Sequence, residues 1–80
     1  MKFYVIYEKN AISTMESDIE GHYKSFEEAS NRVKKFEGDY DADVVAIING
    51  EWCRLEEMDN EIFYKPVEKN EEYWMPLSMA

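Results

Sequence analysis

The sequence contains one cysteine, Cys53, and one histidine, His22, among its 80 residues. A single cysteine cannot form a disulfide within the chain, so packing must stabilise the fold, as is usual in reducing compartments. One cysteine and one histidine also cannot supply the three or four nitrogen and sulfur ligands of a zinc site. We therefore expect no zinc site and no cofactor, and we expect the protein to be cytoplasmic.

Glycine and long hydrophobic runs are also scarce. The three glycines, Gly21, Gly38 and Gly50, are scattered, which excludes a glycine-rich loop that binds phosphate. The apolar run near the N-terminus is too short for the hydrophobic part of a signal peptide. No stretch approaches the roughly 18 apolar residues that a membrane-spanning helix needs. The sequence thus predicts neither a signal peptide nor a membrane partner.

Basic residues number nine against 18 acidic ones, which gives a net charge of −9. Such a charge repels phosphate backbones and anionic lipid head groups over a Debye length of roughly 8 Å. It attracts basic surfaces, which are common on proteins that hold nucleic acid. We therefore expect no direct binding of nucleic acid, and a protein partner with a basic, nucleic-acid-handling surface.

What the sequence does contain is enough apolar side chain for a core. Hydrophobic residues make up 45% of the chain and aromatic residues 15%, a composition that is not typical of disorder. A chain of this length can bury only about two thirds of its unfolded surface and cannot divide that core in two. We expect residues 1–80 to form a single domain.

Two strands are predicted before the helix. The segment 2–8, KFYVIYE, is rich in β-branched and aromatic residues and is apolar on both faces, which is typical of a strand inside a sheet. The segment 19–24, IEGHYK, is short enough to return antiparallel to it. Residues 9–18 show no periodicity and are predicted to be a loop.

The segment 25–38 predicts a helix. Ser25 is a suitable N-cap, because its side chain can accept from the Glu28 N–H while the Glu28 carboxylate accepts from the Ser25 N–H. Glu28 and Arg32 have the spacing of an i,i+4 ion pair, and Gly38 is a suitable C′ residue. Four apolar residues fall on one stripe that should face the core: Phe26, Ala29, Val33 and Phe36.

The sequence VVAIINGEWCRLE, residues 44–56, predicts a β-hairpin with Asn49 and Gly50 as a type I′ turn. This turn sets a register in which Val44 lies opposite Leu55. One face of the hairpin should pack on the helix and carries Val44, Ala46, Ile48, Cys53 and Leu55. The other face needs a cover or a partner and carries Val45, Ile47, Trp52 and Arg54.

The C-terminal part predicts one more strand and an apolar segment. Residues 61–67, EIFYKPV, should form a strand at a sheet edge, because Pro66 cannot donate to a ladder. The apolar tail 73–80 either docks over the second face of the sheet or binds another chain. The fold class is therefore α+β: a single small domain with a mainly antiparallel sheet of four to five strands, in the order ββαββ, and one helix packed on one face.

No catalytic group stands out. Cys53 lies on the apolar face of the hairpin, where a thiol is usually an inert core group, and His22 on a short edge strand is expected to be solvated or hydrogen-bonded. One helix on a small sheet rarely encloses a cleft that could bury a substrate. We predict that the chain is not an enzyme.

Asp39, Asp41 and Asp43 alternate as the first ligands of a calcium loop do. The rest of such a loop is missing, because Val44 and Gly50 stand where an EF-hand needs glycine and glutamate. We expect a solvated connection between helix and strand, with no metal.

Two runs of carboxylates flank the predicted hairpin. Because Val44 and Leu55 lie opposite each other at the end away from the turn, the residues before one and after the other should be neighbours. We predict a negative pole of seven side chains there: Asp39, Asp41, Asp43, Glu56, Glu57, Asp59 and Glu61. The plainer interpretation is that these acids only keep the sheet edges unpaired and the chain from aggregating.

Aromatic residues near the acids favour a binding role: Tyr40, Trp52, Tyr73 and Trp74. Aromatic side chains supply buried area in protein interfaces, while charge sets the sign of the partner. The acidic residues and these four aromatic residues together form the predicted partner-binding surface.

The MKFYVIYEKN opening, the SFEEASNRVKKF helix, the Asn-Gly hairpin and the acidic balance resemble a class of small bacteriophage accessory proteins, which includes anti-CRISPR and anti-restriction inhibitors. This resemblance implies an inhibitor that occupies a basic nucleic-acid-binding surface of a host protein, with possible mimicry of DNA phosphates, in the host cytoplasm. It assigns no residue.

Two other functions are compatible with the sequence. The apolar segment 73–79 could dock on a second copy over Val45, Ile47 and Trp52, which would make the chain a structural or self-assembling subunit and a homo-oligomer. The chain could also be a sensor of a small ligand or of calcium.

Overall fold

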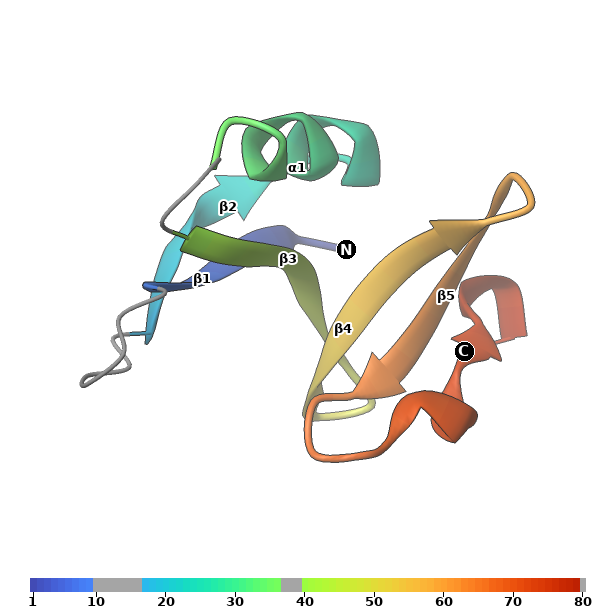
Figure 1. The fold of residues 1–80 in the computed structure, drawn as a ribbon. Helices are drawn as coiled ribbons and strands as arrows, with labels where there is room; N and C mark the ends of the chain where they lie inside the picture. The colour runs from blue at the N-terminus through green and yellow to red at the C-terminus, as the bar shows by residue number, and fades with distance from the viewer. Residues whose placement is uncertain (10–16, 37–39, 80) are drawn as a thin grey trace.

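In the part of the chain that the structure describes, the strands form one antiparallel sheet with a single α-helix packed on it (Figure 1). The computed structural model describes residues 1–9, 17–36 and 40–79. The sheet has the spatial order β2-β1-β3-β4-β5-β6. Its elements are β1 (Phe3–Lys9), β2 (Ser17–Tyr23), α1 (Phe26–Val33), β3 (Tyr40–Ile48), β4 (Glu51–Met58), β5 (Glu61–Pro66), the 3-10 helix η1 (Glu71–Tyr73), β6 (Met75–Pro76) and the 3-10 helix η2 (Leu77–Met79). The predicted α+β class is confirmed, but within the described residues the sheet has six strands, because Met75–Pro76 adds a short one.

Strand β1 lies inside the sheet, between β2 and β3, as its two apolar faces predict. Phe3 and Val5 point to the helix side and are buried in the core. The strand pairs antiparallel with both neighbours. A register shift between Phe3 and Val5 lies opposite Gly21, which has a positive φ of 47°. A bulge of this kind is tolerated at glycine, which has no Cβ to clash.

Helix α1 begins where the sequence predicts and ends earlier. Ser25 Oγ accepts from the Glu28 N–H at 3.1 Å, which confirms the N-cap. The Glu28 carboxylate accepts from the Lys24 N–H at 3.2 Å and not from Ser25, so the reciprocal half of the predicted capping box is wrong by one residue. The last helical residue is Val33, followed by a turn in which the Phe36 N–H donates to Val33 O. The predicted C′ residue, Gly38, lies outside the described residues.

Arg32 joins the helix to the edge strand β2. Its Nη2 donates to Glu20 Oε2 at 2.9 Å, its Nε donates to the other carboxylate oxygen, and Tyr23 Oη donates to the same carboxylate at 3.1 Å. The Arg32 guanidinium also lies 4.5 Å from the centre of the Phe36 ring, which stacks on Tyr7. The predicted i,i+4 ion pair between Glu28 and Arg32 is therefore not formed, because Arg32 pairs with Glu20 of β2 instead.

The β3–β4 hairpin has the predicted turn and register. Asn49 and Gly50 have positive φ of 53° and 82°, as a type I′ turn requires, and Val44 lies opposite Leu55. The face that packs on the helix is confirmed, since all its members are buried in one cluster: Val44, Ala46, Ile48, Cys53 and Leu55. The alternation of side chains across a strand thus decides which residues form the core.

Strands β3 and β4 separate beyond Val44 and Leu55. Residues 40–43 of β3 pair with β1, whereas residues 56–58 of β4 pair with β5. In Figure 1 these two parts diverge, with the helix above one and the β4–β5 hairpin extending away on the other side. We call this opening the fork.

Strand β5 is not an edge strand, which corrects the prediction based on Pro66. It lies between β4 and β6. Strand β6 pairs only with Phe63 and Tyr64, so it ends before the level of Pro66 and needs no N–H from it.

The C-terminal segment packs on its own chain. Lys65 is only 3% exposed, its Nζ donates to Lys69 O at 2.9 Å, and it lies 5.4 Å from the Trp74 ring centre. Leu77 packs against the core. Tyr73 and Met79 remain exposed.

Candidate functional site

The β4–β5 hairpin carries a concentration of acidic side chains. Asp59 and Asn60 form its two-residue turn, with positive φ of 53° and 63°. Positive φ at both central residues is typical of a type I′ turn, in which Gly, Asn and Asp are the preferred residues. Four side chains around this turn are exposed, and we call residues 56–61 the acidic hairpin: Glu56, Glu57, Asp59 and Glu61.

Few groups of the chain neutralise the acidic hairpin. Glu61 Oε1 accepts a long hydrogen bond of 3.5 Å from Ser78 Oγ. In the part of the chain that the structure describes, Glu56, Glu57 and Asp59 form no ion pair and no side-chain hydrogen bond. Their charges therefore face solvent and are available to an approaching cation.

Asp41 and Asp43 lie on β3, on the other side of the fork, and both are exposed. Asp43 Oδ2 is 3.7 Å from Arg54 Nη1, a weak and partly solvated ion pair. Asp39 lies outside the described residues, and Tyr40 is the first residue of β3. Because β3 and β4 separate here, the carboxylates on β3 and those of the acidic hairpin do not form one continuous surface.

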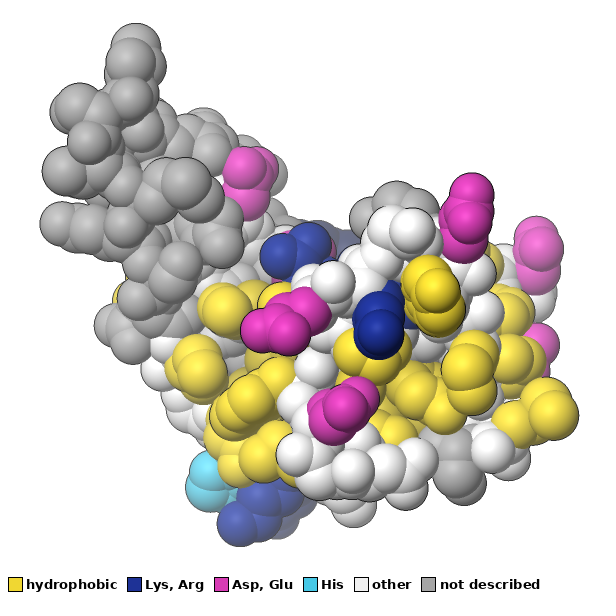
Figure 2. Space-filling model, turned by 90° about the horizontal axis from the view of Figure 1, so that it is seen from below, with side chains coloured by type: hydrophobic (Ala, Val, Ile, Leu, Met, Phe, Trp, Pro, Cys, Tyr) yellow, Lys and Arg dark blue, Asp and Glu magenta, His cyan; other side chains and the backbone are white. Residues whose placement is uncertain are grey.

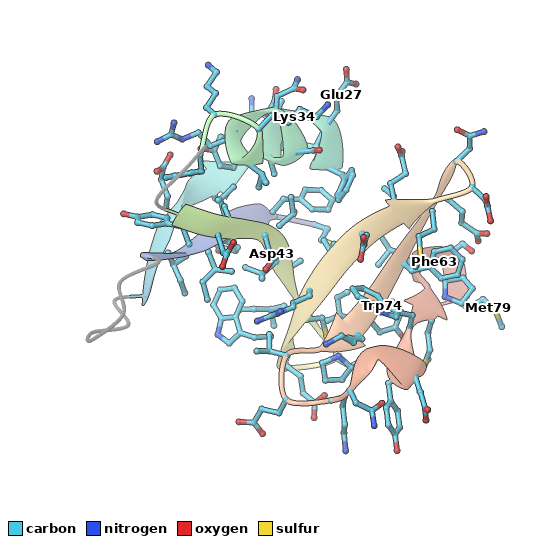
Figure 3. The ribbon with its side chains drawn as sticks, in the orientation of Figure 1. Glu27, Lys34, Asp43, Phe63, Trp74 and Met79 are labelled. Atoms are coloured by element: carbon cyan, nitrogen blue, oxygen red, sulfur yellow. The ribbon has the colours of Figure 1, made fainter. Side chains whose placement is uncertain are left out.

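A cavity of about 370 Å³ occupies the fork. Its apolar wall includes Phe26, Val33, Leu55 and Trp74, and its charged residues are Lys34, Asp43, Arg54, Glu56 and Glu57. Figure 3 shows Lys34 at the C-terminal end of the helix, Asp43 on β3 and Trp74 on the opposite side of the fork. Three of the seven predicted carboxylates thus meet at the fork, with two basic residues among them, while Asp59 and Glu61 lie at the hairpin turn.

Trp52, Tyr73 and Trp74 of the predicted surface are divided between two places. Trp52 is 39% exposed on the sheet face opposite the helix, where its ring meets Tyr4 edge-on at 5.2 Å. Trp74 contacts Lys65, and Tyr73 lies beside Lys69, with 5.5 Å between Nζ and the ring centre. Trp74 therefore shares the fork with Asp43, Glu56 and Glu57, whereas Trp52 lies apart from them on the other face of the sheet.

Cys53 is a core residue, as predicted, with 2% of its surface exposed. Burial, and to a lesser degree the nearby Glu51 carboxylate, raises the pKa of the Cys53 thiol, so it stays protonated at neutral pH. His22 is exposed, and its ring lies 6.5 Å from that of Tyr4. Within residues 1–9, 17–36 and 40–79, no three His, Cys, Asp or Glu side chains come together as metal ligands would.

Sequence reasoning missed the second hairpin, and of the apolar surface beside Trp52 it predicted only the part on β3 and β4. The Asp59-Asn60 pair was a usable signal for the hairpin, because it separates two β-forming runs by two turn residues. The apolar surface gathers residues of five strands, including Ile6 and Ile19. No local pattern predicts that, because it depends on strand order.

Comparisons with protein-family models, with curated proteins and with solved structures found no match to this chain. No helix in the described part of the chain is both long and apolar enough to cross a membrane.

Proposed function

We propose that the chain is a non-enzymatic protein-binding module whose acidic hairpin engages a basic surface of a partner protein. The observation that carries this proposal is the exposure of Glu56, Glu57, Asp59 and Glu61 around one protruding turn (Figure 1). Carboxylates without internal partners keep their full attraction for Lys and Arg of another protein, because no internal bond must be broken first.

The distribution of charge along the chain supports the same role. Residues 51–80 hold eight acidic and three basic residues, a net charge of −5 in thirty residues, whereas residues 1–50 hold ten acidic and six basic ones. Two of the three basic residues in the C-terminal part, Lys65 and Lys69, lie against Trp74 and Tyr73. The C-terminal part of the sequence, which carries the acidic hairpin, therefore has the higher density of negative charge.

The partner class follows from the sign and density of this charge. Proteins that hold nucleic acid present rows of Lys and Arg to phosphates spaced along the duplex. A rigid hairpin with four carboxylates can occupy part of such a row and exclude the nucleic acid, and it acts as a phosphate mimic over a short stretch. This mode of action agrees with the resemblance to small phage-encoded inhibitors, which stays an analogy.

The test is capture of proteins from a bacterial lysate on the immobilised chain, followed by elution with a short DNA duplex. We expect the duplex to release the captured partner, because both ligands use one basic surface. We also expect E56Q/E57Q to retain about tenfold less partner, as loss of two charge-assisted contacts would cause.

The matched control is E27Q/E72Q, which removes the same charge from exposed positions outside the acidic hairpin. This variant should retain the partner within about twofold of the unchanged chain, because it changes only the overall charge and not the contacts of the acidic hairpin. Equal retention by the two double variants, or a partner that duplex DNA leaves on the column, would refute the proposal.

A further inference from the structure

The sheet face without a helix is hollowed into an apolar groove of about 530 Å³. The groove crosses β2, β1, β3 and β4 and ends against residues 66–69. Figure 2, which views the molecule from the side opposite the helix, shows hydrophobic side chains spread over this face with few charges among them. We call it the open-face groove, and its apolar members are Ile6, Ile19, Val45, Trp52, Pro66 and Val67.

The groove has a packed floor and exposed walls. Val45 is only 1% exposed and forms part of the floor, whereas Ile19 is 45% and Trp52 39% exposed. Ile47, the next residue of β3 on the same face, is 50% exposed. Single exposed apolar residues are ordinary, but a continuous set lining a groove is typical of a binding surface.

Acidic residues lie at both ends of the groove. At one end, Ile6 also borders a smaller cavity lined by Asp41 and Asp43. At the other end the lining includes Glu51 and Glu68. The positions of Asp43 and Glu51 along the β3–β4 ladder are five residues apart, which is roughly 16 Å at the rise of a strand.

The basic residues near the groove are already engaged within the chain. Arg54 pairs with Asp43, and Lys69 lies beside the Tyr73 ring. The groove therefore offers apolar contact in its middle and net negative charge at its ends.

This pattern selects one occupant. The described C-terminal segment is docked on β5, away from the groove. A second copy would bring two chains of charge −9, with their acidic groove ends, into contact, which like-charge repulsion opposes. A segment with apolar residues between basic ones complements both the middle and the ends.

We propose that the open-face groove binds a basic amphipathic segment of the partner protein: a few adjacent apolar residues flanked on both sides by Lys or Arg. This inference rests on the proposed function, in that the partner is basic, and it adds a second contact that depends on apolar burial. The aliphatic parts of the flanking Lys or Arg side chains lie along the groove rim while their charged ends reach the carboxylates.

The probe is an acetylated and amidated peptide with the sequence Lys-Lys-Leu-Phe-Leu-Leu-Lys-Lys. Its four central residues span roughly 13 Å when extended, which suits the distance between the acidic ends. A second peptide replaces the four central residues with serine and keeps every charge. By calorimetric titration we expect the apolar peptide to bind at least about tenfold more tightly, because only it buries apolar surface in the groove.

Two matched variants locate the site. I19K places a positive charge in the groove, and M75K makes the same change at an equally exposed residue of β6, 46% against 45%, outside the groove. We expect I19K to weaken binding of the apolar peptide about tenfold and M75K to leave it within about twofold. Circular dichroism of both variants checks that the fold is kept.

Equal weakening by I19K and M75K would overturn the groove as the site, and so would equal affinity for the two peptides. Neither outcome would refute the proposed function, which is tested separately by the duplex elution and by the E56Q/E57Q comparison.

Discussion

The two faces of the sheet differ in what covers them, because the helix packs on one face and the other carries exposed apolar side chains. Ile47 and Ile48 are chemically identical neighbours on β3. Ile47 is 50% exposed on the open face, whereas Ile48 is 5% exposed on the face that packs on the helix. The helix covers only one face, so strand alternation assigns one residue to stability and leaves the next on the surface. The difference teaches that only some of the apolar residues of this small protein are buried and stabilise the fold, while others lie on its surface.

The largest effect should come from truncating these two neighbours. I48A removes a buried side chain from the core and should lower the free energy of unfolding by about 3 kcal/mol, whereas I47A should cost less than about 1 kcal/mol. Urea denaturation followed by circular dichroism measures both. Similar losses for the two variants would mean that the open face is also covered.

A second comparison concerns the C-terminal segment, which covers part of β5. W74A removes the ring that lies over the buried Lys65, and we expect a loss of about 2 kcal/mol, because apolar contact and a cation–π interaction disappear together. Y73A, which changes the exposed neighbouring ring, should cost less than about 1 kcal/mol. Urea denaturation measures the free energy of unfolding of both variants. A W74A variant as stable as Y73A would show that the C-terminal segment contributes little to stability.

The helix that covers the closed face depends on its N-cap. S25A removes the acceptor for the Glu28 N–H and should cost about 1 kcal/mol, whereas S25D should restore most of it. If S25A and S25D are equally destabilised, the hydrogen bond seen at Ser25 does not stabilise the helix.

The smallest effect is a pH dependence from the contact between helix and edge strand. The hydrogen bonds from Arg32 lower the pKa of Glu20 below its ordinary value of 4.5. The charged form is thus favoured in the folded state, so this contribution to stability is present above pH 4.5 and is lost as the pH falls through the lowered pKa. Both side chains are about one third exposed, so solvent screening keeps the contribution small.

The measurement is thermal unfolding at several pH values between 6 and 3 for the unchanged chain and for E20Q. The E20Q variant should be slightly less stable at pH 6 and should lose less on acidification. Parallel pH curves for the two proteins would contradict the assignment.

The parts of the fold that were predictable from the sequence are those set by local signals. The Asn49-Gly50 turn gave the register of β3 and β4, and Ser25 gave the start of the helix, because each depends on residues a few positions apart. The core face of the hairpin followed from the register and strand alternation.

The parts that were not predictable depend on contacts between distant segments. The fork exists because β3 continues along β1 while β4 continues along β5, and no property of the hairpin sequence says where the two will separate. The pairing of Arg32 with Glu20 likewise depends on the place of β2 under the helix. For the same reason the predicted negative pole is divided, with Asp43, Glu56 and Glu57 at the fork and Asp59 and Glu61 at the hairpin turn. The part of the open-face groove on β3 and β4 was foreseen, but the contributions of β1, β2 and residues 66–69 were not.

The two indole N–H signals of the protein give the most direct test of an open face that is free for a partner. Trp52 lines the open-face groove and Trp74 does not. In a nitrogen-15 NMR titration with the Lys-flanked apolar peptide, we predict that the Trp52 indole signal shifts in proportion to binding while the Trp74 signal stays in place. A shift of the Trp74 signal alone, or of neither signal at saturating peptide, would contradict the account.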